Sequence, residues 1–369
     1  MKTVPMRPCF GRATRGFSLV ELMVGLAIGM IGVVIMMQIF SVSEGYKRTT
    51  TGGDDAQNNG AISLYGLQRD LRMAGEGSNA FTDNAASTSA YSLIGCNLTL
   101  RAGVTINGLG PVTINSASVT STKDANTDTL LIFYGNGNDG PEGDHIESQP
   151  ATNTYTLAAF AAASAPSMAV QDYVVAHPTP RPSPCNLSMT QVSAVAGSNV
   201  TVSAGVAGMT GGALFNIGKP SGVGTPPRFI AYRVSGGALL MCDYMVSDCS
   251  SSASANWTTV ASNIVSVRAQ YGRDTTAGTM DGTVDVFDQT APTNICDWVR
   301  MRAVRLAIVS RSAQLEKGAV TTAAPAWAGS AGNAIDLSAD TSWQSYRYKV
   351  FETVVPLRNV AWLGAQAGC

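Results

Sequence analysis

Charged side chains are scarce in this chain of 369 residues: they make up 13% of it, and histidine occurs only twice. Neither His145 nor His177 lies in an H-E-x-x-H motif, a nucleophile elbow or a Walker loop. We expect both to be surface histidines. Lysine and arginine form no cluster beyond Arg15, and a nucleic-acid partner requires one. The sequence therefore predicts no enzyme and no nucleic-acid partner.

One long apolar run extends from Phe17 to Phe40 and contains a single charged residue, Glu21. A helix of about 24 residues is on the order of 36 Å long, which exceeds the roughly 30 Å of a bilayer core. The run can therefore span a membrane once. Four basic residues and no acid precede it, which predicts a cytoplasmic N-terminus and a translocated remainder: they are Lys2, Arg7, Arg12 and Arg15.

Glu21 is the unusual residue of this run. A carboxylate inside an apolar membrane helix costs about 2.5 kcal/mol or more, so such an acid is expected to have a partner. Cleavage between Gly16 and Phe17 would create an α-amino group one helical turn before Glu21. That amine, or the amine of a neighbouring identical helix, would neutralise the acid.

The stretch from Gly16 to Leu22, GFSLVEL, resembles the class III signal of type IV pilins and pseudopilins. The resemblance implies that prepilin peptidase cuts after Gly16 and methylates Phe17, and that Glu21 guides assembly. An ordinary signal peptide or signal anchor is the alternative, but the run ends in MMQIF rather than in a small-residue cleavage site.

One position departs from the pilin pattern. Many major pilins carry a proline about two thirds of the way along this helix, where this chain has Gln38. The local melting that such a proline permits is therefore not expected. Gly25, Gly29 and Gly32 remain as positions where helices can approach closely.

Six cysteines remain once Cys9 leaves with the leader, and an even number in a translocated chain fits a disulfide framework. Six cysteines allow fifteen complete pairings. The short separation of Cys242 and Cys249 predicts a local loop clasp. We expect the remaining pairs to be Cys296 with Cys369, and Cys96 with Cys185. Cleavage also leaves 20 basic residues against 25 acidic ones, a net charge of about minus five.

The segment after the apolar run predicts an amphipathic second half of the same helix, over residues 46–77. Gly52, Gly53 and Gly60 predict a break between the two halves, and the helix should stop at Gly75 or Gly77. An apolar stripe is expected at Ala61, Leu64, Leu67 or Gln68, Leu71 and Ala74. The opposite, solvated face is expected to hold Arg69, Asp70 and Arg72.

Residues 78–369 predict a β-rich head, so the fold class is α+β. Its first part, 78–225, is mostly loop-like, with a buried strand at 128–134 and weaker strands at 170–175 and 192–202. Its second part, 226–369, predicts hairpins at 228–244 and 263–287 and strands at 304–310 and 346–356. Four domains are therefore expected. They are a leader (1–16), a membrane or filament helix (17–45), the amphipathic half of that helix (46–77), and an antiparallel head that disulfides stabilise (78–369).

Four segments spread along the chain resemble the PilW group of minor pilins, which is related to the J-type minor pseudopilins of type II secretion: 67–75, 263–274, 298–312 and 346–359. The resemblance implies a minor pilin that primes pilus assembly in a tip complex with other minor pilins, beside the major pilin and a large tip adhesin. It implies an inner-membrane protein with a periplasmic head that later joins the pilus tip. The alternatives are a type II secretion pseudopilin and an anchored ectodomain that never polymerises.

No cofactor is expected, and calcium is the one metal with weak candidates. Asp274, Asp281 and Asp285 lie around two glycines, as hard cations prefer, and a second acidic loop contains Asn138, Asp139 and Asp144. Neither loop has the spacing of an EF-hand, and Asp-Gly is also a hairpin turn. Four tryptophans are expected in core or edge packing rather than in a sugar platform: Trp257, Trp298, Trp343 and Trp362.

Overall fold

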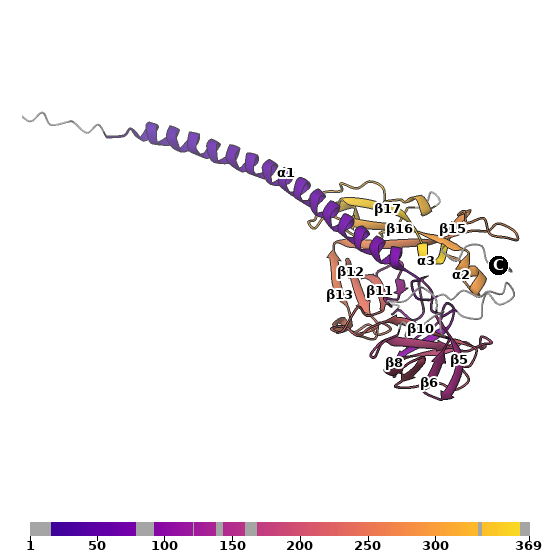
Figure 1. The fold of residues 1–369 in the computed structure, drawn as a ribbon. Coiled ribbons are helices and arrows are strands. Elements are labelled where there is room, and N and C mark those ends of the chain that lie inside the picture. Colours follow the sequence, from indigo (N-terminus) through magenta and orange to yellow (C-terminus); the bar gives the residue numbers. More distant parts are fainter. Residues whose placement is uncertain are drawn as a thin grey trace, which may run out of the picture. The chain divides into compact units, whose positions relative to one another are not determined.

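The computed structural model describes residues 16–78, 92–120, 122–137, 143–158, 168–330 and 334–361. The chain divides into two compact units, Met1–Thr51 and Gly52–Cys369. Of the first unit the structure describes residues 16–51, which are helical from Leu19 onward, and the second unit contains the end of that helix and the named strands (Figure 1). The second unit is called the head below.

Helix α1 runs without interruption from Leu19 to Met73. The predicted break at the three glycines was therefore wrong. The reason lies in packing: a Cβ on Gly60 would come within 2.2 Å of the Phe351 ring, and one on Gly52 within 3.1 Å of Ser312. These glycines let the helix approach the sheet closely, and they do so in helical conformation. The helix does end where predicted, since Gly75 follows it at φ +85°.

The buried face of α1 within the head repeats at intervals of three and four residues. It consists of Gly52, Ala56, Gly60, Ser63, Leu67, Asp70, Leu71 and Ala74. Two predictions on this segment were wrong: Ala61 is exposed, and Asp70 is only 2% exposed instead of solvated. The predicted positions Leu67, Leu71 and Ala74 are confirmed as buried.

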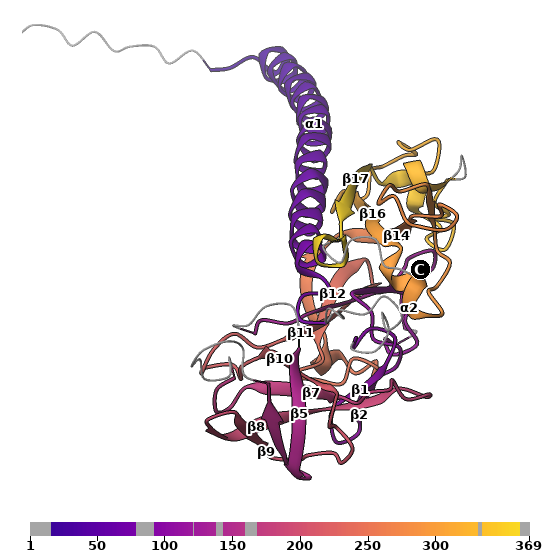
Figure 2. The same ribbon diagram turned by 45° about the vertical axis from the view of Figure 1, so that its right-hand side comes forward.

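The strands form three sheets, of eight, five and four strands. Figure 2 shows the eight-stranded and the four-stranded sheet at opposite ends of the head. The eight-stranded sheet comprises β1 (Asn97–Arg101), β2 (Val104–Ile106), β5 (Asp144–Ala151), β6 (Thr154–Leu157), β7 (Tyr173–His177), β8 (Asn186–Ala196), β9 (Asn199–Val202) and β10 (Ala213–Gly218). The five-stranded sheet comprises β3 (Val112–Ile114), β4 (Leu130–Tyr134), β11 (Arg228–Ser235), β12 (Ala238–Asp243) and β13 (Thr258–Ser262). The four-stranded sheet comprises β14 (Ile264–Arg273), β15 (Val286–Asp288), β16 (Met301–Arg311) and β17 (Tyr348–Pro356). Two short helices, α2 (Ile295–Val299) and α3 (Arg358–Ala361), complete the head.

The second part of the head follows the sequence prediction closely. The hairpin β11–β12 turns at Gly236 and Gly237, both of which have positive φ as its tight turn requires. The antiparallel pairs β14–β15 and β16–β17 are also present. The α+β fold class is confirmed, and all pairings between named strands but one are antiparallel, the exception being β1 with β8.

The first part of the head is more regular than predicted. Residues 97–114 contain three strands where loops were expected, and the single strand expected at 192–202 is a hairpin, β8–β9, that turns at Gly197. Because β9 pairs with both β6 and β8, six strands of the large sheet close into a ring. This ring has its own apolar cluster, which includes Tyr155, Val174 and Leu214.

The five-stranded sheet is buried on both faces. Alternate residues of β4 and β11, such as Ile132 and Ile230, pack in one cluster with α1 and the four-stranded sheet. The residues between them, such as Phe133 and Phe229, pack in a second cluster with β1, β7 and β10. Two-sided burial explains why the run LLIFY is continuously apolar, and the predicted buried strand is confirmed.

Replacing Gly60 by alanine should destabilise the head by about 1–3 kcal/mol, because the added methyl group overlaps the Phe351 ring. The matched control is Gly66→Ala in the same helix, where a Cβ meets nothing within 4 Å. That substitution should stabilise by about 0.5–1 kcal/mol, since alanine favours helix. Denaturant unfolding of the full chain in detergent measures both, and equal effects of the two substitutions would contradict the packing role.

Candidate functional site: the exposed half of the helix and its attachment to the head

The first half of α1 carries a continuous apolar surface. Every large apolar side chain from Phe17 to Tyr46 is at least 50% exposed within the chain. Among the described residues α1 alone is long and apolar enough to span a membrane. Exposed apolar surface of this extent marks contact with lipid or with other proteins.

Glu21 lies in the first turn of α1, close to the predicted cleavage point. Its Oε2 atom accepts a hydrogen bond of 3.4 Å from the backbone N–H of Ser18, the residue before the helix begins. The Ser18 carbonyl in turn accepts from the Leu22 N–H at 3.1 Å. Glu21 therefore also serves as a helix cap in the uncleaved chain, in half of a capping box that the spacing S-x-x-E could have revealed.

Three glycines of the exposed half have open space around them in the part of the chain that the structure describes. A Cβ added at Gly25, Gly29 or Gly32 would meet nothing within 4 Å. They differ in this from Gly60, which the fold of the head requires. A stripe of small residues on a helix that belongs in a membrane or filament permits close approach of a second helix.

The second half of α1 is attached to the head by a buried carboxylate that the sequence analysis missed. Asp70 accepts hydrogen bonds from the hydroxyls of Tyr232 on β11, at 2.6 Å, and Tyr134 on β4, at 3.3 Å. Arg69 lies 3.4 Å from the same carboxylate, but its side chain is 68% exposed and contributes little. The sequence did contain one indication of this contact: Tyr134 and Tyr232 lie at inward positions of neighbouring strands, and their hydroxyl groups require a polar partner on the helix.

The electrostatics of this cluster keep the tyrosines as donors. Burial, followed by the charge of Asp70, raises the pKa of Tyr232 far above its usual range. The same two causes raise the pKa of Tyr134. Both hydroxyls therefore stay protonated at physiological pH and donate to Asp70. Each oxygen of the Asp70 carboxylate accepts one of these two hydrogen bonds.

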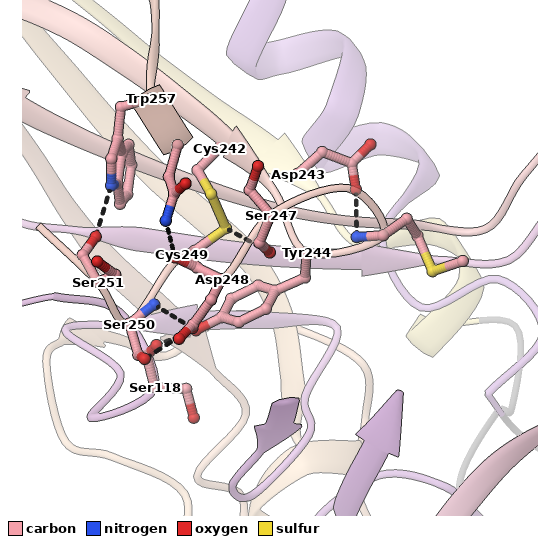
Figure 3. Close-up of a disulfide and its surroundings, with 12 residues drawn as sticks. Ser118, Cys242, Asp243, Tyr244, Ser247, Asp248, Cys249, Ser250, Ser251 and Trp257 are labelled. Atoms are coloured by element: carbon pink, nitrogen blue, oxygen red, sulfur yellow. Dashed lines mark hydrogen bonds between the residues drawn. A yellow bond between two sulfur atoms is a disulfide. The ribbon is translucent and has the colours of Figure 1, made fainter. Parts of the chain in front are cut away.

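Two of the expected disulfides are formed. Cys242 and Cys249 close the loop that follows β12, and Cys96 pairs with Cys185 (Figure 3 shows the first). Around the loop, Tyr244 donates to the Ser118 carbonyl, and the Trp257 indole N–H donates to the Ser251 carbonyl at 2.9 Å. Cys296 is also a disulfide cysteine, whereas Cys369 lies outside the described residues, so that pairing stays a prediction.

The acidic loop of the weak calcium candidates is organised by hydrogen bonds and an arginine. Asp274 accepts from the backbone N–H of Thr276 and Gly282, at 3.0 and 2.8 Å, and lies 3.7 Å from Arg300. Burial favours a raised pKa for Asp274, but these donors and the arginine hold it below its usual value.

The other two carboxylates of this loop also accept hydrogen bonds from their own loop. Asp285 accepts from the Thr275 N–H at 2.7 Å, and Asp281 accepts from the Thr283 N–H at 2.8 Å. A cation would have to displace these donors and lie close to Arg300. The geometry therefore does not favour calcium at this loop. In the second acidic stretch, Asn138 and Asp139 lie outside the described residues.

The two histidines and the tryptophans differ in how well they follow the prediction. His145 is exposed as predicted, but His177 is fully buried at the end of β7, so its prediction as a surface histidine was wrong. Trp257 and Trp298 lie in the apolar core, which confirms that part of the packing prediction. Trp362 lies outside the described residues.

Comparisons with known proteins were made for the whole chain. Residues 11–37 match the prokaryotic N-terminal methylation motif, and residues 229–359 match the family described as type IV pilus-assembly protein W. No curated protein sequence matches significantly. A type IV-like pilin from Thermus thermophilus matches in structure with 10% identity over 82% of this chain and 96% of that chain. Its TM-score of 0.30 supports no argument.

A methylation motif that overlaps the start of a long apolar helix, in a chain that also has a β-rich head, is typical of type IV pilin-related proteins. Within this class, the match over residues 229–359 is similarity to the PilW group of minor pilins. The predicted resemblance is confirmed.

Replacing Asp70 by alanine should destabilise the head by about 1–3 kcal/mol, because two buried tyrosine hydroxyls lose their acceptor. Tyr232→Phe should cost a similar or smaller amount, and the two substitutions together should cost less than their sum. Tyr65→Phe is the control, since Tyr65 is 72% exposed on the same helix and should change stability by less than about 0.5 kcal/mol. Denaturant unfolding measures all four proteins, and additive effects would argue against a shared cluster.

Proposed function

We propose that this chain is a low-abundance pilin that primes assembly of a type IV pilus in a tip complex with other minor pilins. The observation that carries the proposal is the exposed apolar half of α1, with Glu21 in its first turn, in a chain whose head matches the PilW family. The mechanism is assembly rather than catalysis.

The proposed sequence of events starts in the inner membrane, with the head in the periplasm. Prepilin peptidase removes residues 1–16 by cutting between Gly16 and Phe17, and it methylates the new N-terminus. Residues 17–45 then leave the lipid and enter the filament core against other minor pilins and the major pilin. At the tip the head is available to a large adhesin.

Energetics support this exchange of environments. Burying one large aliphatic side chain contributes about 1.5–3 kcal/mol, and the first half of α1 exposes a long series of them. The segment is therefore unstable in water and needs either lipid or a protein surface. Because both are apolar, transfer from lipid to filament has a small net cost in hydrophobic free energy.

The role of Glu21 can be tested by two substitutions that separate charge from capping. If its charge pairs with the Phe17 amine of a neighbouring subunit, both Glu21→Ala and Glu21→Gln should reduce the amount of this pilin in sheared pili by about tenfold. If capping of Ser18 is what matters, Glu21→Gln should be incorporated normally, because an amide oxygen can still accept.

Leader cleavage provides the control for this measurement. We expect both variants to be cleaved normally, so mass spectrometry of the membrane fraction should find methylated Phe17 as the N-terminal residue in each. Glu44→Ala, on an exposed position of the same helix, should leave incorporation unchanged. An uncleaved wild-type chain would favour the anchored ectodomain over the pilin.

The tip location and the choice between pilus and secretion need a second experiment. Deletion of the gene should reduce surface pili, and immunogold labelling of an epitope on the head should mark one end of the filaments. Label along the shaft would contradict the tip location. Normal pili together with loss of secreted proteins would identify a type II secretion pseudopilin instead.

A further inference from the structure

Three adjacent strands of the eight-stranded sheet bring two cysteines and a histidine together. Cys96 and Cys185 directly precede β1 and β8, which pair in parallel with Asn97 opposite Asn186. Strand β7 runs antiparallel to β8 and ends at His177. The starts of β1 and β8 and the end of β7 therefore lie at the same end of the sheet, and the sulfur and nitrogen atoms all lie within 4.8 Å of one another.

His177 is buried directly beside this disulfide. It is fully buried, and its Nε2 atom lies 4.0 Å from Cys185 Sγ. Its Nδ1 atom makes no hydrogen bond of good geometry among the described residues, but the carbonyl groups of His177 and Pro178 lie close to the ring. Burial, followed by the charge of Arg181, lowers the pKa of His177 to about 4. A ring nitrogen of an imidazole in this place is a possible metal ligand on the geometry alone.

The disulfide alone does not account for this histidine. A covalent clasp needs two cysteines, and the clasp between Cys242 and Cys249 is surrounded by serines, aspartates, a tyrosine and a tryptophan (Figure 3). In contrast, the described residues around Cys96 and Cys185 supply a third soft or borderline ligand.

We propose that reduction of the Cys96–Cys185 disulfide creates a binding site for a thiophilic divalent cation of the Zn²⁺ type, with His177 as the third ligand. The reductant is a dithiol, which is oxidised to its own disulfide while Cys96 and Cys185 each gain a proton and an electron. Zn²⁺ then displaces the two thiol protons and binds two thiolates and the neutral imidazole. Water fills the fourth position, as in open zinc sites.

The geometry fits such a site after small movements. Zn–S and Zn–N bonds of about 2.3 and 2.0 Å place tetrahedral ligands roughly 3.5–4 Å apart. The histidine nitrogen is already at this distance from Cys185 Sγ, and only the two sulfurs must separate. The parallel pairing of β1 and β8 holds the two cysteine backbones in place, since their Cα atoms are 4.8 Å apart.

Access to the site comes from the side of Cys185. Cys185 is partly exposed, whereas Cys96 is fully buried. The segment 178–184 joins His177 to Cys185. Within it, Arg181 donates hydrogen bonds to the carbonyls of Ser92 and Ile94, each at 2.7 Å, and these bonds hold the segment in place. A dithiol would therefore attack at Cys185. Disulfide and metal use the same sulfurs, so each state excludes the other.

The experiment uses the full chain in detergent, reduced with dithiothreitol, freed of reductant under nitrogen, and titrated with Co²⁺ as a probe for Zn²⁺. We expect about one Co²⁺ per chain, with sulfur-to-cobalt charge transfer and the intense visible bands of tetrahedral cobalt. His177→Gln should weaken binding by about tenfold or more. The oxidised protein should give no signal.

Cysteine variants assign the site. The double substitution Cys96→Ser with Cys185→Ser should abolish the cobalt spectrum, whereas Cys242→Ser with Cys249→Ser, and separately Cys296→Ser, should leave it unchanged. Persistence of the spectrum in the first variant, or its insensitivity to His177→Gln, would overturn the proposal, and so would absence of binding to the reduced wild type.

A measurement on the wild type alone covers the case in which the variants do not fold. Bound Co²⁺ or Zn²⁺ should slow alkylation of Cys96 and Cys185 in the reduced protein, and peptide mass spectrometry should show no slowing at Cys242 and Cys249. Protection of the second pair instead, or of neither, would contradict the site.

Discussion

The hydrogen bonds from Tyr134 and Tyr232 to Asp70 fix the helix against the head at one point, and much of the structure depends on that contact. The two hydroxyls come from adjacent strands, β4 and β11, so the carboxylate can be satisfied in one register of helix and sheet. A one-residue slip of either strand would turn its tyrosine to the opposite face. The apolar cluster of α1 with the five- and four-stranded sheets then forms around this fixed point.

Close approach is the second requirement for this packing, and Gly60 supplies it. Without a side chain at this position, the Phe351 ring of β17 occupies the space next to the helix axis. The Ser310 hydroxyl of β16 donates to the Ala56 carbonyl at 2.7 Å beside it. The polar anchor at Asp70 and the close contact at Gly60 are separated by about 15 Å of helix at 1.5 Å per residue. Together they resist both rotation and sliding of the helix.

These two residues also show where sequence reasoning succeeds and fails. The apolar positions Leu67, Leu71 and Ala74 and the runs of β4 and β11 could be predicted, because burial of apolar side chains imposes a period. Gly60 was interpreted as a helix breaker and Asp70 as a solvated charge, because average propensities assign those roles. Their actual roles depend on Phe351, Tyr134 and Tyr232, which are far away in sequence, and no local pattern contains that information.

The same limit applies to His177 and to the first part of the head. A histidine before a proline gives no sign in the sequence that β7 will place it beside Cys185. The closed ring of six strands is equally invisible locally, because it arises when β9 pairs with both β6 and β8. Short strands that contain polar residues such as Thr, Ser and Asn carry weak individual signals, and the pairing of distant strands stabilises them.

The two halves of α1 differ in where their apolar side chains find contacts. The head half of the helix packs against the five- and four-stranded sheets of its own chain, so its stability does not require lipid or a filament. Among the described residues of the first half, a Cβ added at Gly25, Gly29 or Gly32 would meet open space. In the proposed assembly, the first half would exchange one apolar environment for another while the head stays folded. That property is what a subunit needs if it is to pass from a membrane into a fibre.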